Sequence, residues 1–126
     1  MQRKNEKLIK QIKDDYLDYI DKVIHFSEKP SELLFGRQIK HILLMHAIQI
    51  NIDNLEDVIK RIQKHEYNFI TLDETLRDDV YKIDATSDYG AGNWLWRWSK
   101  IFKRQDEIMI LHPFYDIWDI IKKYRI

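Results

Sequence analysis

The sequence predicts an α/β fold that is rich in helix and contains a small parallel sheet. The first observation is a long apolar periodicity of helical type in residues 4–27. The second is a strand–helix–strand pattern in residues 42–72. Because parallel strands need a crossover connection, which is usually a helix, this pattern predicts a right-handed parallel pair.

The first predicted helix runs from about Lys4 to Ser27, where apolar residues recur every three or four positions. Its stripe comprises Leu8, Ile12, Tyr16, Tyr19, Ile20, Val23 and Phe26. Pro30 lies shortly beyond the stripe and Gly36 follows. We therefore expect the helix to end near Ser27 and the chain to turn at Gly36.

The predicted sheet begins in residues 39–47, whose short apolar centre, residues 42–45, is typical of a strand buried on both faces. A helix follows from about Asp53 to His65, and residues 67–72 form a second predicted strand. Two strands alone would leave both sheet edges open. We therefore expect another chain, an N-terminal half or a covering helix to complete this sheet.

The rest of the chain is predicted to be mainly helical. A short helix is expected from Asp73, a loop in residues 84–92, and a helix from Trp94 to about Arg104. A last helix is expected from Pro113, because proline suits the first turn. One of its faces would carry Phe114, Ile117, Trp118, Ile121 and Tyr124. We expect one domain over residues 1–126, with residues 100–126 as a helical tail.

Composition excludes several functional classes. Lys plus Arg and Asp plus Glu both number 21, and this zero net charge argues against capture of nucleic acid. The absence of cysteine excludes disulfides and thiolate metal sites. The N-terminus lacks the apolar core of a secretory signal, and no apolar run is long enough for a membrane span. We expect neither a nucleic-acid nor a membrane partner.

Among the five histidines, His46 lies at the C-terminal end of the first predicted strand. Catalytic groups of parallel α/β folds gather at such strand ends. A histidine hydrogen-bonded to a neighbouring loop would occupy the same position, so both interpretations stay open. His41 lies five residues earlier and would face the opposite side of the strand, so the two cannot share a metal ion. No metal site is predicted.

Two other clusters are better explained by structure than by chemistry. The adjacent carboxylates of Asp78 and Asp79 are more typical of a solvated helix face or turn than of a catalytic dyad. Trp94, Trp96 and Trp98 could suggest a sugar-stacking platform. Alternate residues of a helix point in different directions, however, so these side chains are predicted to anchor the core.

The order of these segments resembles the C-terminal half of the polysaccharide deacetylase family over residues 15–98. The matching segments are residues 15–20, 34–39, 42–47, 51–53 with the helix that follows, and 67–74. A weaker match runs from Asp84 to Trp98, where relatives often read Gly-x-Ser-Trp-x-His-Arg-Trp. Residues 100–126 match no part of that family.

This resemblance implies half of a deacetylase-type α/β barrel and a hydrolase that removes N- or O-acetyl groups from glycans. In complete relatives an Asp and two His of the N-terminal half hold a divalent metal, often zinc, and a neighbouring Asp acts as base. The family's Leu-x-His motif is Leu44-Met45-His46 here. By this resemblance His46 would be the catalytic acid that protonates the leaving group, and Leu44 would line the pocket for the acetyl methyl group.

Several family features are missing from this chain. The Thr-Phe-Asp-Asp and His-x-x-x-His-Pro motifs are absent, Ala47 replaces a common Asp, and Trp96 replaces a common His. We therefore expect no cofactor in this chain, no activity of the chain alone, and carbohydrate binding only after completion by an N-terminal half. One alternative is a non-catalytic module of the same origin that self-associates or binds a partner chain. Another is a metal site assembled from several copies around His46.

Overall fold

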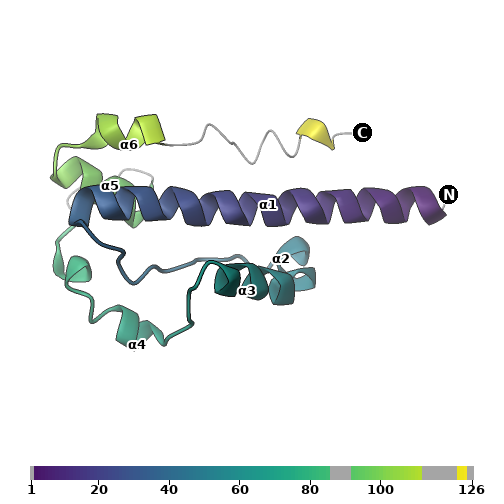
Figure 1. Ribbon diagram of the computed structural model, residues 1–126, viewed down its shortest axis with the longest axis horizontal. Coiled ribbons are helices and arrows are strands. Elements are labelled where there is room, and N and C mark those ends of the chain that lie inside the picture. Colours follow the sequence, from purple (N-terminus) through teal and green to yellow (C-terminus); the bar gives the residue numbers. More distant parts are fainter. Residues whose placement is uncertain (1, 86–91, 112–121, 125–126) are drawn as a thin grey trace. The chain divides into compact units, whose positions relative to one another are not determined.

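A computed structural model describes residues 2–85, 92–111 and 122–124 of the chain, and this part is helical. Its elements are α1 (Gln2–Phe35), α2 (Gln49–Asp53), α3 (Leu55–Lys64), α4 (Leu72–Thr75), the 3-10 helix η1 (Asp79–Lys82), α5 (Trp94–Ile101) and α6 (Gln105–Leu111) (Figure 1). No strand occurs in the described residues. The predicted α/β fold with a parallel sheet, and the half barrel with it, is therefore wrong.

The two predicted strands fail for a physical reason: side chains take backbone groups that a neighbouring strand would otherwise satisfy. Before residues 42–45, the Lys40 N–H donates to the Asp78 carboxylate at 3.0 Å. In the second segment, the Thr71 N–H donates to the Glu74 carboxylate at 3.0 Å. This last contact belongs to a capping box that starts α4 inside the predicted strand.

The α1 helix is longer than its apolar stripe predicts. It continues past Ser27 and through the buried Pro30, which has no N–H to donate, and ends at Phe35. The predicted turn at Gly36 is confirmed: its φ is +65°, and its N–H donates to the Glu32 carbonyl oxygen at 2.8 Å. Glycine suits this left-handed position, which closes the helix end.

The exit from α1 depends on the buried Ser31. Its hydroxyl donates to the Arg37 carbonyl oxygen at 2.8 Å and accepts the Ile39 N–H at 2.9 Å. One side chain thus satisfies two backbone groups just beyond the helix. It also holds Ile39 against the core, where Ile39 is only 5% exposed.

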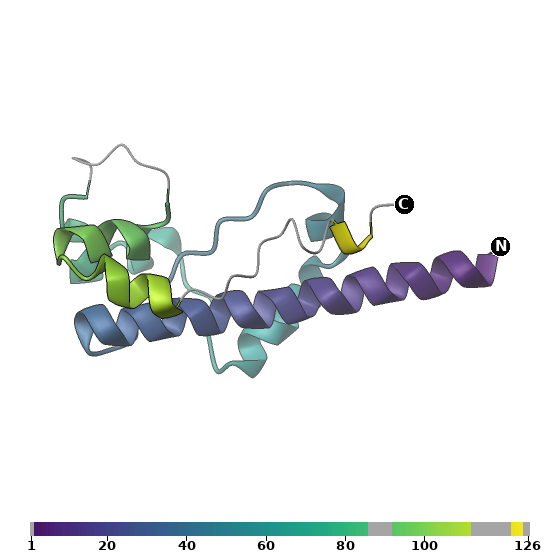
Figure 2. The ribbon, with the colours of Figure 1, turned by 90° about the horizontal axis from the view of Figure 1, so that it is seen from above.

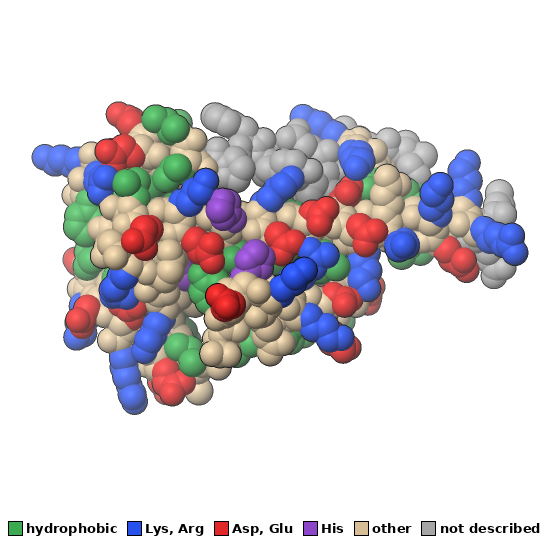
Figure 3. Space-filling model, viewed as in Figure 1, with side chains coloured by type: hydrophobic (Ala, Val, Ile, Leu, Met, Phe, Trp, Pro, Cys, Tyr) green, Lys and Arg blue, Asp and Glu red, His purple; other side chains and the backbone are tan. Residues whose placement is uncertain are grey.

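The chain divides into two compact units, and α1 contributes residues to both. The first unit comprises residues 1–24, 45–68 and 114–126, and the second comprises residues 25–44 and 69–113. The core of the first unit is formed by Tyr16, Leu17 and Ile20 of α1 and by Val58 of α3. Val58 is fully buried, so this residue of α3 faces the core. Along α1, basic and acidic side chains follow one another on the visible face (Figure 3).

The second unit is built around Trp98 of α5, which is fully buried. Its ring meets that of Phe35 edge to face, with centroids 5.3 Å apart. The other core residues are Ile39, Val80, Ala85 and Leu95. The α5 helix begins after Asn93, whose side chain accepts the Trp96 N–H at 3.0 Å. The α6 helix then packs against α5 (Figure 2).

The C-terminal predictions are tested only in part. The helix predicted from Trp94 to about Arg104 is α5, which ends at Ile101. The helix expected from Pro113 lies outside the described residues, apart from residues 122–124. Within the described part of the chain, no helix combines the length and the apolar character needed to cross a membrane.

Candidate catalytic histidine

His46 lies in the non-helical segment before α2, and the residue is exposed. Its carbonyl oxygen accepts hydrogen bonds from the Ile48 N–H at 2.9 Å and from Asn51 Nδ2 at 2.8 Å. Asn51 Oδ1 in turn accepts the hydroxyl of Tyr16 at 2.5 Å. Tyr16 is a buried residue of α1. The backbone of His46 is therefore held to α1 within the first unit.

Local sequence explains this arrangement. Ile48, at the N-cap of α2, has no side chain that can accept a hydrogen bond, so the helix start lacks a side-chain cap. Asn51 reaches back from the first turn of α2 to the His46 carbonyl instead. The sequence left two interpretations of His46 open: a catalytic group, or a histidine whose ring is hydrogen-bonded to a neighbouring loop. Within the described residues, no such hydrogen bond of the ring is observed. The contacts are made by its backbone.

Leu44 lies at the surface and is 83% exposed. Its neighbours Ile42 and Leu43 are 42% and 48% exposed, so three consecutive apolar side chains are uncovered. A shallow hollow elsewhere in the second unit is lined by Lys29, Glu32, Leu33 and Leu111 and includes none of these three. The acetyl-pocket role of Leu44 stays a prediction of the family resemblance.

A divalent metal does not fit the described residues. In residues 2–85, 92–111 and 122–124, no group of three or more His, Asp or Glu side chains could hold an ion. His41 belongs to the second unit and lies 3.2 Å from Gln38 Oε1. Burial lowers the pKa of His41, although Glu28 and Asp78 act in the opposite direction.

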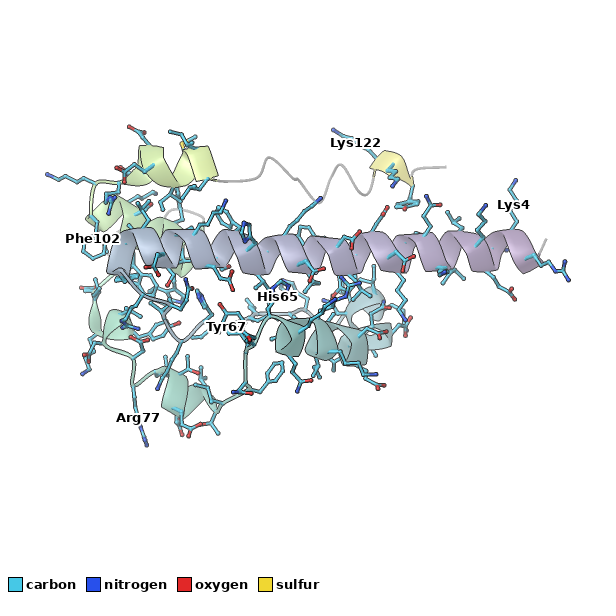
Figure 4. The ribbon with its side chains drawn as sticks, viewed as in Figure 1. Lys4, His65, Tyr67, Arg77, Phe102 and Lys122 are labelled. Carbon is cyan, nitrogen blue, oxygen red and sulfur yellow. The ribbon has the colours of Figure 1, made fainter. Side chains whose placement is uncertain are left out.

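An ion cluster in the first unit was missed by the sequence analysis. Asp21 of α1 accepts a hydrogen bond from Arg61 of α3 and lies 2.8 Å from His65 Nε2. Figure 4 shows His65 between its own helix and α1. Burial opposes ionisation of Asp21, but the His65 and Arg61 hydrogen bonds outweigh it and lower the pKa of this carboxyl. These contacts hold α3 against α1.

A sequence signal for this cluster exists but is weak. Arg61 and His65 are four residues apart, which places both on one face of α3. The same face of many solvated helices carries such residues, so spacing alone does not identify Asp21 as their common partner. That pairing depends on how α3 packs against α1.

The Asp78–Asp79 pair was predicted to lie on a solvated helix face or in a turn, and Asp78 is instead a buried residue at the N-cap of the 3-10 helix η1. Its side chain is 3% exposed and receives both Arg37 guanidinium nitrogens, at 3.0 and 2.5 Å. It also accepts the N–H groups of Lys40 and Val80, at 3.0 and 3.2 Å. The Arg37 hydrogen bonds, against the opposing effect of burial, hold the pKa of Asp78 well below its usual range. Asp79 is exposed, as predicted.

Among Trp94, Trp96 and Trp98, which were all predicted to anchor the core, only Trp98 is buried; Trp94 is exposed and Trp96 is partly buried. Trp98 is fully buried, which confirms its predicted function as a core anchor. Trp94 stacks on it with centroids 5.7 Å apart and planes inclined by 30°, and is itself 42% exposed. The Arg97 guanidinium lies 5.8 Å from the Trp94 ring centroid, within the range of a cation–π contact.

The comparisons with known proteins add no relative to this description. No family model, no curated protein and no solved structure matches the chain.

Proposed function

We propose that this chain supplies a proton donor, His46, to a metal-dependent hydrolase that removes acetyl groups from glycans, and that the chain alone is inactive. The resemblance of residues 15–98 to the polysaccharide deacetylase family supports the reaction class. The observation that carries the role of His46 is its exposed position on a backbone held by Asn51. A catalytic acid needs both access to the substrate and a fixed position.

The chemistry assigned to His46 is a single proton transfer. The imidazolium gives its proton to the leaving nitrogen or oxygen of the glycan while the bond to the acetyl carbon breaks. The products are acetate and a free amine or hydroxyl, and the neutral imidazole recovers a proton from solvent. Histidine suits this exchange near neutral pH. The groups that activate the attacking water would come from the N-terminal half that complete members of the resembling family carry.

Exposed apolar residues shortly before His46 in the sequence support the proposal that a second protein component completes the enzyme. Ile42, Leu43 and Leu44 are each more than two-fifths exposed. Burying a fully exposed side chain of this size stabilises a complex by about 1.5–3 kcal/mol before the costs of association, so Leu44 offers most of this energy and the half-exposed Ile42 and Leu43 about half of it each. A component that carries the metal ligands would gain this energy by covering the segment, whose last residue, Leu44, precedes His46 by two positions in the sequence.

The first test reads the coding DNA in frame with, or adjacent to, that of this chain. We expect it to encode a Thr-Phe-Asp-Asp segment and a His-x-x-x-His-Pro segment. A locus that encodes neither contradicts the proposal, because no source of metal ligands would accompany His46.

The second test measures acetate released from acetylated chitooligosaccharides in the presence of Zn²⁺. We expect no release by the isolated chain and release after co-expression with the encoded metal-binding segment. His46→Ala should lower the rate of the pair by about 10²- to 10⁴-fold, the usual contribution of a general acid. His25→Ala is the matched control, because the His25 side chain is also exposed, at 64%. Unchanged activity of the His46→Ala pair would contradict the role.

A second candidate function is that of a self-associating module, which the uncovered residues 42–44 favour. With 21 basic and 21 acidic residues, two copies have no net charge to repel each other. Light scattering at increasing concentration should then show a dimer or larger species that Leu43→Ser and Leu44→Ser weaken. A strict monomer at the highest concentration contradicts this candidate and leaves the first one in place.

A further inference from the structure

We infer that Tyr16 and Asn51 are positioning residues for His46, a role that rests on the proposed function. The Tyr16 hydroxyl donates to Asn51 Oδ1 at 2.5 Å, and Asn51 Nδ2 donates to the His46 carbonyl oxygen at 2.8 Å. A side-chain bridge thus joins the middle of α1 to the backbone of the candidate acid. The three residues belong to the same compact unit.

The hydrogen-bonding chemistry allows one orientation of the Asn51 amide. A backbone carbonyl can only accept, so the amide nitrogen must face His46. The amide oxygen then faces Tyr16, whose hydroxyl must donate. The order of donors and acceptors along the bridge is therefore defined at both ends, and replacement of either side chain breaks it.

The anchor of the bridge is rigid and keeps its proton. Tyr16 is 9% exposed and packs in the core cluster that contains Val58. Burial, with a smaller contribution from Tyr19, raises the pKa of Tyr16. The phenol therefore stays a donor throughout the pH range in which histidine gains and loses a proton. The hydrogen bond from Tyr16 to Asn51 is therefore retained over that pH range.

Asn54 provides a matched comparison within the same stretch. Its Nδ2 donates to the Ile50 carbonyl oxygen at 2.7 Å, and the residue is 8% exposed. Both asparagines thus donate a side-chain N–H to a backbone carbonyl four or five residues earlier. Only the Asn51 bond ends on His46, so a general loss of local stability can be separated from a loss of positioning.

The test follows the backbone carbonyl ¹³C resonance of His46 in the isolated, labelled chain by NMR. Asn51→Asp keeps the side-chain size but removes the donor, so we expect the resonance to move upfield. Tyr16→Phe should move it in the same direction by a smaller amount, and Asn54→Ala should leave it in place. Circular dichroism confirms that each variant is folded, and Tyr16→Phe carries the test if Asn51→Asp unfolds. An unmoved resonance in the folded bridge variants, or an equal shift in Asn54→Ala, overturns the inference.

An activity measurement on the completed pair separates this inference from the proposed function. Asn51→Asp should lower kcat by about 100-fold with a smaller change in KM, the cost expected of a group displaced by about 1 Å. Asn54→Ala should retain kcat. If His46→Ala abolishes activity while Asn51→Asp leaves kcat unchanged, the positioning role fails alone. If the carbonyl shift is seen but His46→Ala retains activity, the proposed function fails while the bridge stands.

Discussion

Replacement of Asp78 by alanine should destabilise the second unit strongly, because four hydrogen bonds end on its carboxylate. Two come from the Arg37 guanidinium, and the others come from the backbone N–H groups of Lys40 and Val80. The side chain is 3% exposed, so water cannot replace the lost acceptor without entering the core edge. The alanine variant would leave the Lys40 N–H without its present partner.

The magnitude follows from these separate losses. Loss of the acceptor for the buried Val80 N–H, which is also the N-cap bond of η1, costs about 1–3 kcal/mol, and the lost hydrogen bond to the N–H of the exposed Lys40 adds about 0.5–1.5 kcal/mol. The Arg37 ion pair adds less than about 1 kcal/mol, because the Arg37 side chain is 47% exposed and solvent screens it. We expect a total near 3 kcal/mol in the free energy of unfolding.

The assay is urea unfolding followed by tryptophan fluorescence, since Trp98 lies in the same unit as Asp78. Asp79→Ala is the control: its side chain is 83% exposed and contacts Lys82, so we expect a change below about 0.5 kcal/mol. Arg37→Met should lie between the two, because it retains both backbone hydrogen bonds to Asp78. An Asp78→Ala variant within about 0.5 kcal/mol of the wild type would refute the reasoning.

The Asp78 carboxylate should also make the free energy of unfolding depend on pH in the acid range. The pKa of Asp78 is below its usual value in the folded chain, so its contribution to stability is complete above the unfolded pKa of about 3.9. That contribution is lost as the pH falls from there toward the folded pKa. Unfolding measured between pH 5 and pH 2 should therefore show a shallower loss of stability in Asp78→Ala than in the wild type.

Three further predictions concern single side chains. Val58→Ala should cost about 2 kcal/mol by creating a cavity, whereas Leu55→Ala on the same helix, where the side chain is 48% exposed, should cost less than about 1 kcal/mol in the same urea assay. Burial raises the pKa of Tyr81 to about 12, so stability should fall as the pH rises from the unfolded value of about 10, and Tyr81→Phe should reduce this alkaline loss, to which Tyr16 also contributes, in thermal unfolding. Arg61→Met should raise the pKa of Asp21 in a carboxyl ¹³C titration and cost about 1 kcal/mol; an unmoved titration would contradict the pairing.

Helices were the predictable part of this fold. One face of a packed helix is buried every three or four residues, so the apolar stripe that includes Tyr16 and Ile20 predicts α1, and both of these residues lie in the core. The predicted end of α1 near Ser27 is too early, because the helix continues through the buried Pro30 to Phe35. The apolar residues 42–45 predict a buried strand. An apolar run shows only that a segment favours burial, and here Leu44 is 83% exposed.

The sequence allows one candidate residue of the site to be named, but not the hydrogen bonds that hold it. His46 could be named from the Leu-x-His motif of a resembling family. Its bridge to Tyr16 could not, because Tyr16 and Asn51 are 35 residues apart and meet only when α2 lies against one particular turn of α1. The same holds for Arg37 and Asp78, which are 41 residues apart.

The Ser31 hydroxyl at the end of α1 has a consequence for the order of folding. Its two bonds join residues only six and eight positions away, so closing them requires little loop entropy. The Asp78 contact to Lys40 spans 38 residues and must wait for a long loop to close. We expect the exit turn of α1 to form early and rapidly, and the distant carboxylate to arrive later at a loop whose backbone donors are already presented to it.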